Sequence, residues 1–571
     1  MDILDSENES GEGMVIQRVD KDDPTRLVAE ISVARLDPDG PSHRNAQTPR
    51  AWLFAEDGSS WYIEADRGRF YIPAGEDTPE SGFLRGNVRA RRYDPLPGGA
   101  RAVPDATTAT ITATTDEPLH FDLDVLAFET EGRLHVDSDE ISFVGRGVYV
   151  VLNEQREQIN HLRVDRGERL TYTPKHESAP AATPPAVTST PASTQTRPAG
   201  ARNTAPAIRP VLWRTATPKV DLYKAVFEDN VVSTQGSRVV RSDTLTVWTR
   251  LIDNKIPKKT PPSSAGGPLR ALLTGLATTV PTPRPADATT SETDDQNSRA
   301  PSPAASSHPA APPEPVVLTW DGPMEVVPLK SDPDELTMGD HVALRFDVTE
   351  DNVEFEDTGT GAHGHAQAAS YYAGRERIEL IGPAGAIELE SPGTGRISGA
   401  NSMYIELAAG VVTVPTAGRL TGADDRVTPG DEHPQRIGWQ SAALFEFVVV
   451  DGRMTDRIER ARFEGDVIGA NSDATLNGER VDAVFDSRPD EGPRLVQLDA
   501  EQARGDDGRG GMLAGDALQV HFAPGTRGED LDPRRVIITG SALARRDEAE
   551  SIHADRIDAA LARDEGGDII V

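Results

Sequence analysis

The chain has 571 residues, a formal net charge of −34 at pH 7 and no cysteine. The negative charge disfavours nucleic-acid binding, which depends on Lys and Arg at phosphates, and indicates an acidic, solvated surface. Without cysteine the chain has no disulfides, no cysteine-ligated zinc and no cysteine nucleophile, and its 5% of aromatic residues leaves Val, Ile, Leu and Ala to build a thin core.

The amino-terminal residues 1–14 are acidic and polar and are predicted to be a disordered tail. They lack the basic and apolar regions of a signal peptide. The chain also has no run of about 18 apolar residues, the length that a transmembrane helix needs. We therefore expect either a cytoplasmic protein or a natural amino terminus upstream of residue 1.

Strand-like patterns fill residues 15–173, 211–256 and 315–571, whereas helical periodicity is scarce. The stretches 174–210 and 257–314 are rich in Pro, Ala, Ser and Thr, a composition that cannot pack a core. The segment between these stretches is too small to be stable alone. We therefore interpret both stretches as disordered linkers inserted into one continuous β-structure, not as domain boundaries.

A short pattern returns four times in the strand-rich regions. It is a large apolar residue, any residue, usually Gly, a small polar residue, and then Val or Ala. Its two apolar positions are four residues apart, which places them on one face of a strand because side chains alternate with period two. The Gly between them is typical of a bulge or of close packing. The copies are Leu84-Arg85-Gly86-Asn87-Val88, Phe227-Glu228-Asp229-Asn230-Val231, Phe463-Glu464-Gly465-Asp466-Val467 and Ile538-Thr539-Gly540-Ser541-Ala542.

A second pattern, interleaved with the first, places Asp or Asn between a small residue and a short apolar run. Its copies fit a unit of roughly 37 to 39 residues, which holds several short strands and must stack on its neighbours. Each Asp follows a turn, where we predict that it caps backbone N–H groups instead of forming a site. The recurring acidic positions are Asp66, Asp139, Asp243, Asp516 and Asp555.

Sequence motifs for catalysis are absent. The chain has no phosphate-binding glycine loop and no His-Glu-x-x-His pair. His363 and His365 lack an evident third metal ligand, and the Gly-rich run after Asp506 is interpreted as a hairpin turn instead of a calcium loop. Carboxylates are too frequent to identify a glycosidase pair. We therefore predict no catalytic, cofactor or metal site, and a protein that is not an enzyme.

The order and spacing of the two patterns resemble those of the OstA-like periplasmic proteins of lipopolysaccharide transport, the LptA and LptC family. The most similar stretches are residues 225–249, 461–485 and 536–561, and residues 371–420 are also alike. The resemblance implies an all-β fold, in which short antiparallel strands stack into an elongated β-taco or β-jellyroll.

The resemblance also implies a function. Such a protein is a non-enzymatic bridge that shelters the acyl chains of lipopolysaccharide, or of a related glycolipid, during transport across the periplasm to the outer membrane. Other OstA-like proteins dock with it edge to edge by β-augmentation. The implied location is periplasmic, with attachment to the inner membrane through a segment upstream of residue 1 in an LptC-like role. The chain departs from the small family members in its length and its two linkers.

If this hypothesis holds, apolar residues of the two patterns line a lipid groove. The low aromatic content favours an open trough of small branched side chains over a tightly filled core. The predicted groove residues are Leu84, Val88, Phe227, Val231, Leu245, Val247, Phe463, Val467, Ile538 and Ala542.

Two alternatives stay open at this point. A structural or adhesive β-solenoid at the cell surface would bury its apolar stripes fully and hold no ligand. A parallel β-helix enzyme acting on acidic polysaccharide would need basic residues clustered across its rungs, whereas Lys is scarce here and the basic residues are scattered. An open apolar groove distinguishes the lipid bridge from the solid solenoid.

Overall fold

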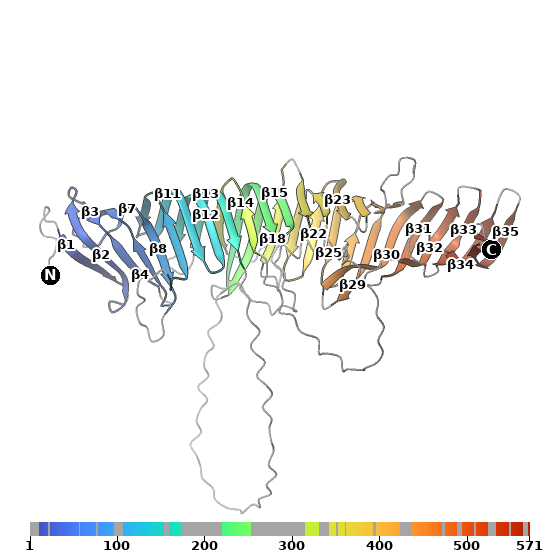
Figure 1. The fold of residues 1–571 in the computed structure, drawn as a ribbon, viewed down its shortest axis with the longest axis horizontal. Coiled ribbons are helices and arrows are strands. Elements are labelled where there is room, and N and C mark those ends of the chain that lie inside the picture. The colour runs from blue at the N-terminus through green and yellow to red at the C-terminus, as the bar shows by residue number, and fades with distance from the viewer. Residues whose placement is uncertain are drawn as a thin grey trace, which may run out of the picture.

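The computed structural model confirms the all-β prediction. None of the residues that it describes is helical, and 35 strands form one sheet that extends as a long stack with the two chain ends at opposite tips (Figure 1). The described residues are 11–20, 23–55, 58–75, 78–95, 107–152, 159–173, 220–252, 315–330, 342–349, 352–359, 361–391, 395–422, 436–450, 453–470, 474–487, 494–507, 510–522, 533–546, 550–563 and 569–570.

The sheet is folded lengthwise into two walls that meet along a corner. The first half of β2 (Leu27–Pro38) pairs with β4 (Arg50–Phe54), and its second half pairs with β3 (His43–Gln47). We call the wall that contains β3 wall A and the wall that contains β4 wall B. Each wall presents alternate side chains to the space between the walls and the others to solvent.

Near the amino terminus the two walls are built from separate short strands. Wall A continues through β6, β7 and β10, wall B through β5, β8 and β9, and both rejoin on one long strand, β11. The bounds are β1 (Gly11–Val19), β5 (Ser60–Glu64), β6 (Arg67–Tyr71), β7 (Ser81–Arg85), β8 (Val88–Tyr93), β9 (Ile111–Thr115), β10 (Leu119–Asp122) and β11 (Ala127–Ser138).

Long strands that cross both walls follow, and then the walls divide again. Wall A takes β18, β21, β22, β25, β26 and β29, and wall B takes β19, β20, β23, β24, β27 and β28. The bounds are β12 (Ile141–Leu152), β13 (Ile159–Tyr172), β14 (Val220–Gln235), β15 (Arg238–Ile252), β16 (Val316–Thr319), β17 (Met324–Leu329), β18 (Val342–Asp347), β19 (Val353–Asp357), β20 (Ala362–Ala366), β21 (Ala368–Tyr372), β22 (Arg377–Ile381), β23 (Gly385–Ser391), β24 (Gly395–Gly399), β25 (Ser402–Glu406), β26 (Val411–Val414), β27 (Gly418–Thr421), β28 (Arg436–Trp439) and β29 (Ala442–Val450).

The carboxy-terminal part of the sheet again consists of long strands. Both walls join on β30, and from β30 to β35 each strand pairs with the next over both walls. The bounds are β30 (Arg453–Ala470), β31 (Thr475–Asp486), β32 (Arg494–Asp506), β33 (Met512–Phe522), β34 (Pro533–Arg545) and β35 (Ser551–Ala560), with β36 (Ala562–Arg563) and β37 (Ile569–Ile570) forming a separate pair.

The first sequence pattern forms the corner. In β30, Gly465 and Asp466 both have positive φ, 77° and 45°, and the pairing with β31 shifts between Glu464 and Val467. Two successive left-handed residues turn the strand from one wall into the other, a conformation that glycine adopts at little cost. The four copies share this geometry, at residues 86–87, 229–230, 465–466 and 540–541. The flanking apolar residues face the interior as predicted, but from two walls joined by a corner, not from one straight strand.

The second pattern belongs to the same corner. The Asp66 backbone N–H donates to the Gly86 carbonyl at 2.9 Å, and Asn87 Nδ2 donates to Asp66 Oδ2 at 2.8 Å. A Cβ on Gly86 would lie 2.7 Å from Asp66 Oδ2, so this corner position has no room for a side chain. Asp139 is different, because it lies in the turn between β11 and β12. The two patterns are thus two halves of one packing feature.

The predicted boundary of the amino-terminal tail, at residue 14, differs from the structure. Residues 11–14 are not part of a tail, because β1 begins at Gly11 and Met14 pairs with Val33 and packs on the interior. The sheet edge supplies backbone partners that a polar sequence alone does not reveal. The predicted linkers, 174–210 and 257–314, lie outside the described residues.

All strand pairings in the described ranges are antiparallel, which excludes the parallel β-helix fold of the enzyme alternative.

Candidate functional site: the interior between the walls

The apolar side chains between the walls form two buried clusters. The smaller, which we call the N-terminal chamber, gathers residues of β2–β8 such as Leu36, Phe70 and Val88. The larger, which we call the main core, extends from Val148 to Ala542. The walls therefore enclose an apolar interior along most of the stack.

A buried pair of threonines lies between the two clusters. Thr115 pairs with Val88 of the N-terminal chamber on one side and with Leu134, which packs on the main core, on the other. Its hydroxyl is 3.3 Å from that of Thr130, and both side chains are buried. The backbone N–H of Gly132 donates to Thr130 Oγ1, which helps to satisfy the buried hydroxyl. The threonine pair thus places a polar layer between the two apolar clusters, and Ser233, which pairs with Val240 and Leu318, adds a buried polar side chain inside the main core.

Aromatic side chains fill the main core at two corners. Trp320, between β16 and β17, is fully buried and contacts Phe227 edge-on with ring centroids 5.0 Å apart. A Cβ on Gly167 of the neighbouring strand β13 would collide with the indole of Trp320, so this glycine makes room for the ring. Trp439 lies in the same way against Gly418 and donates its indole N–H to the Thr416 carbonyl at 2.8 Å. The interior is solid at these two levels.

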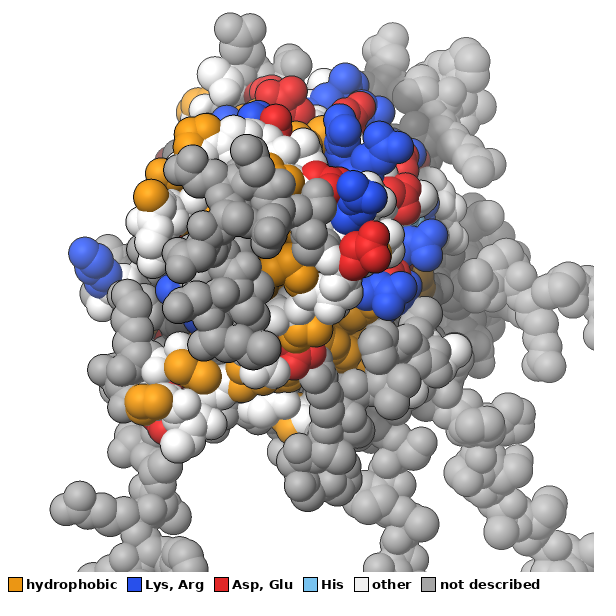
Figure 2. Space-filling model, turned by 90° about the vertical axis from the view of Figure 1, so that its left-hand side faces the viewer, with side chains coloured by type: hydrophobic (Ala, Val, Ile, Leu, Met, Phe, Trp, Pro, Cys, Tyr) orange, Lys and Arg blue, Asp and Glu red, His pale blue; other side chains and the backbone are white. Residues whose placement is uncertain are grey.

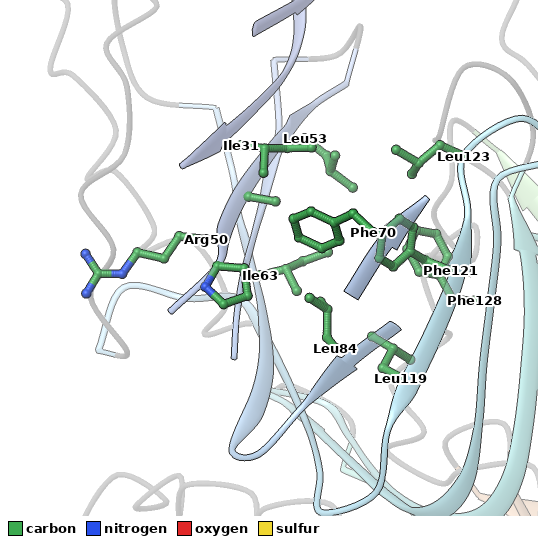
Figure 3. A pocket seen from close by; sticks show the side chains of 12 residues that line it. Ile31, Arg50, Leu53, Ile63, Phe70, Leu84, Leu119, Phe121, Leu123 and Phe128 are labelled. Carbon is green, nitrogen blue, oxygen red and sulfur yellow. The ribbon is translucent and has the colours of Figure 1, made fainter. Parts of the chain in front are cut away.

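The N-terminal chamber, by contrast, retains a cavity of about 40 Å³. Its lining is almost wholly apolar, with Ile63, Phe70, Leu84 and Phe121 converging on it while Arg50 points away (Figure 3). A cavity of this size and character stays dry and holds no more than a few methylene groups. The chamber is therefore less completely packed than the main core.

The carboxy-terminal strands leave space on the inner face of wall B, away from the corner. Gly469 and Gly505 pair with Leu476 from opposite sides, so the three residues share the inner face. A Cβ on Gly469 would meet its nearest atom only at 3.9 Å, and one on Gly505 only at 3.8 Å. Leu476 and Leu513 beside these glycines are half-buried. This row of alternating glycine and leucine forms a shallow apolar strip.

All ten residues predicted to line a groove lie in the interior. Nine are buried, with exposed fractions of 8% or less, and Val247 packs against the main core while half-buried. The structure divides them between the two clusters. Leu84 and Val88 belong to the N-terminal chamber, and Phe227, Val231, Leu245, Val247, Phe463, Val467, Ile538 and Ala542 belong to the main core.

Sequence reasoning missed the residues that fill or interrupt the interior. Trp320-Asp321-Gly322-Pro323-Met324 has a similar order of residue types, with Pro in place of the small polar residue and Met in place of Val or Ala. Trp320 and Met324 are both buried, but none of the three residues between them has positive φ, and the chain passes from wall B to wall A, the reverse of the four copies. The threonine pair and the inner glycines carry no local signal, because their role depends on which strands lie opposite.

The outer faces of the walls carry most of the charged side chains, together with two small buried apolar clusters, Trp52, Tyr62 and Tyr93 on wall B and Leu222, Trp248 and Ala343 on wall A. Burial would raise the pKa of Asp482, but hydrogen bonds from Arg462 and Arg480 outweigh it and lower the pKa. Asp357 has the same balance, with its pKa lowered by Ser237 and Arg238. Seen from the N-terminal end, acidic and basic side chains gather together along one flank of the stack (Figure 2). The arginines that pair with Asp357 and Asp482 thus stabilise the outer faces of the walls.

His363 approaches Glu390 at 3.7 Å, but no group of three or more metal-ligating side chains occurs among the described residues. No helix in the described ranges has the length and apolarity needed to cross a membrane.

Comparison with models of known protein families and with curated proteins finds no match to this chain.

Proposed function

We propose that the protein is a non-enzymatic bridge for lipids, of the OstA-like kind, which shelters acyl chains of lipopolysaccharide or a related glycolipid in the periplasm. The observation that carries the proposal is the continuous pair of walls with largely apolar inner faces, which the Thr115–Thr130 pair divides into two clusters. Burial of tails stabilises such a complex by about 0.8 kcal/mol per CH₂ group. The acidic, mixed-charge exterior favours recognition through tails over recognition through phosphates.

The acyl chains do not lie at the corner in this proposal. Val231, Val467 and Ile538 are at most 1% exposed and are already fully packed. The half-buried residues farther from the corner are accessible, and the strip around Gly469 and Gly505 has room beside it. We therefore place lipid tails against Leu476 and Leu513 of wall B and Val520 of wall A, with the corner residues as the floor beneath them.

The two ends of the stack fit partners of the same fold. In the described part of the chain, β1 pairs only with β2, and β35 pairs only with β34. Each end strand therefore has one edge of backbone N–H and C=O groups that can accept another strand. Stacking further OstA-like proteins on these edges would extend the apolar interior toward both membranes.

Site-specific photo-crosslinking tests the proposal. A photoreactive residue at Leu476 or Val520 faces the interior, while one at Asn477 or Gln519 on the same strands faces solvent. Expressed in a Gram-negative host, the inward positions should capture a glycolipid detectable by mass spectrometry, and the outward positions should not. Capture should also change little with added salt, because no charge is involved. Equal capture at all four positions, or at none, contradicts the lipid bridge.

A solid structural solenoid is the second candidate, and the packing around Trp320 and Trp439 favours it. Where both indoles are fully buried, the interior has no room for a ligand. The two candidates differ in what co-purifies with the protein. A solenoid carries no stoichiometric lipid after gel filtration, whereas a bridge does.

A further inference from the structure

The outer face of wall A carries a groove of about 460 Å³ near the amino terminus. It extends over β3, β6, β7, β10 and β11, on the side of the wall opposite the N-terminal chamber. Because side chains alternate along a strand, Phe70 and Leu84 point into the chamber, while Tyr71 and Phe83 point into the groove. Most of the groove therefore lies outside the apolar interior, although Phe121 and Phe128 line both spaces, and its size is within the range of small-ligand sites.

Aromatic rings line this groove in cross-strand pairs. His43 and Tyr71 are direct partners in β3 and β6, with ring centroids 5.4 Å apart. Phe83 and His120 are direct partners in β7 and β10, with centroids 5.7 Å apart. Tyr149 of β12 extends the row. Apart from His120, which is exposed, these rings are half-buried, so each rests on the wall and still presents a face or edge to solvent.

Polar groups surround the rings. Ser81, Asp122 and Glu129 line the groove with Arg69, whose Nε lies 2.7 Å from Asp39 Oδ2. Within the described ranges, the Glu129 carboxylate and the Tyr149 hydroxyl form no hydrogen bond with another residue, so both are available to a ligand. The lining holds two carboxylates and one arginine that is already paired, so it does not favour an anion.

We propose that this groove binds a short neutral saccharide. A pyranose ring has an apolar face of C–H groups and a rim of hydroxyls. The C–H face packs on aromatic rings, and the hydroxyls both donate to carboxylates and accept from tyrosine or arginine. The groove offers both kinds of contact. The rings of Tyr71 and Phe83 can pack on the C–H face, and the side chains of Ser81, Asp122 and Glu129 can bond the hydroxyls. The site goes beyond lipid carriage, because it lies on the outer face and needs no ligand between the walls.

Titration of the full-length protein with neutral oligosaccharides tests the site. The probes are glucose, galactose and N-acetylglucosamine oligomers, followed by isothermal calorimetry and ligand-observed NMR. At least one series should bind, and Phe83→Ala and Tyr71→Ala should each weaken it about tenfold or more. Tyr404→Ala is the matched control, since Tyr404 lies on the outer face of the same wall beside Arg377, 4.6 Å from ring to guanidinium carbon, and should leave binding unchanged.

The remaining arms separate folding, ligand source and ligand class. Glu129→Gln keeps the shape of the groove and should weaken binding even where an aromatic variant fails to fold. A free saccharide and the headgroup of a glycolipid offer the same chemistry, so the delipidated oligosaccharide of a glycolipid is compared with the intact lipid. The proposal is overturned if no saccharide binds, or if Tyr404→Ala loses as much binding as the groove variants. Lipid capture at Leu476 is measured separately, so the two proposals fail independently.

Discussion

The N-terminal chamber and the main core lie between the same two walls, yet the chamber retains a cavity and the main core is filled at the level of Trp320. In the chamber, Leu84 and Val88 flank the turn and Phe70 and Phe121 converge around an unfilled space. In the main core, the indole of Trp320 fills the space next to Phe227 and lies against Gly167 of the neighbouring strand β13. Residues 321–323 lack the positive φ of residues 86 and 87, so the two levels differ in backbone geometry as well as in the volume of the side chain between the walls.

The threonine pair separates these two regions chemically. Thr115 and Thr130 replace apolar residues at the one level where the two clusters meet. A lipid tail crossing this level would leave the desolvated hydroxyls without additional partners, which is unfavourable. The comparison therefore suggests that apolar contents do not pass freely along the whole stack.

The largest expected effect is in the main core. Trp320→Ala removes a fully buried indole and should lower the free energy of unfolding by about 3–5 kcal/mol. Trp320→Phe should cost much less, because Nε1 has no hydrogen-bond partner among the described residues and the smaller ring buries no donor. Urea denaturation of both variants measures the difference. Equal small losses would show that the main core is not filled by this ring.

The corner glycines come next. Gly540 has φ +66° and lies against the Asp516 carboxylate, so Gly540→Ala should destabilise by about 2 kcal/mol or more. Gly505 has no positive φ, and a Cβ there would make only an ordinary contact at 3.8 Å, so Gly505→Ala should be neutral or stabilising by up to about 1 kcal/mol. Thermal unfolding of the two variants compares corner with wall. A large loss at Gly505 would contradict the open strip.

Adding methyl groups distinguishes the two interiors directly. Ala461→Val in the filled main core should cost about 1–3 kcal/mol through overpacking. Ala51→Val, beside the cavity of the N-terminal chamber, should be neutral or stabilising by up to about 1 kcal/mol. Chemical denaturation of each variant, at unchanged m-value, provides the test. Similar costs at both positions would show that the chamber is as tightly packed as the core.

The smallest effect is a dependence on acid. The pKa values of Asp357 and Asp482 are lowered from 3.8 on folding, so both carboxylates stabilise the fold fully above pH 3.8. This contribution is lost as the pH falls below 3.8 toward the lower folded values. Asp482→Asn should therefore flatten the decrease in melting temperature between about pH 4 and pH 2. An unchanged slope would show that the arginines do not hold this carboxylate ionised.

Part of the fold was predictable from individual residues. The spacing of Phe463 and Val467 around Gly465 indicated strands with an inward-facing apolar pair, and both side chains are indeed buried. The start of β1 was missed, because residues 11–13 are Gly, Glu and Gly, which have low strand propensity, and gain their order from pairing with β2. The low aromatic content led us to expect an open trough. It did not reveal that two tryptophans, Trp320 and Trp439, fill the interior at their levels.

What the sequence by itself determined is the repeating corner. A glycine or asparagine in the left-handed conformation, with apolar residues on either side, is a local requirement that short-range sterics impose on the backbone. Only the tertiary structure decided how the interior is filled. Whether Gly167 faces Trp320, or Gly505 leaves room for a Cβ, depends on which strands lie opposite one another, far apart in the chain. Packing between such strands is a property of pairs, and no single segment encodes it.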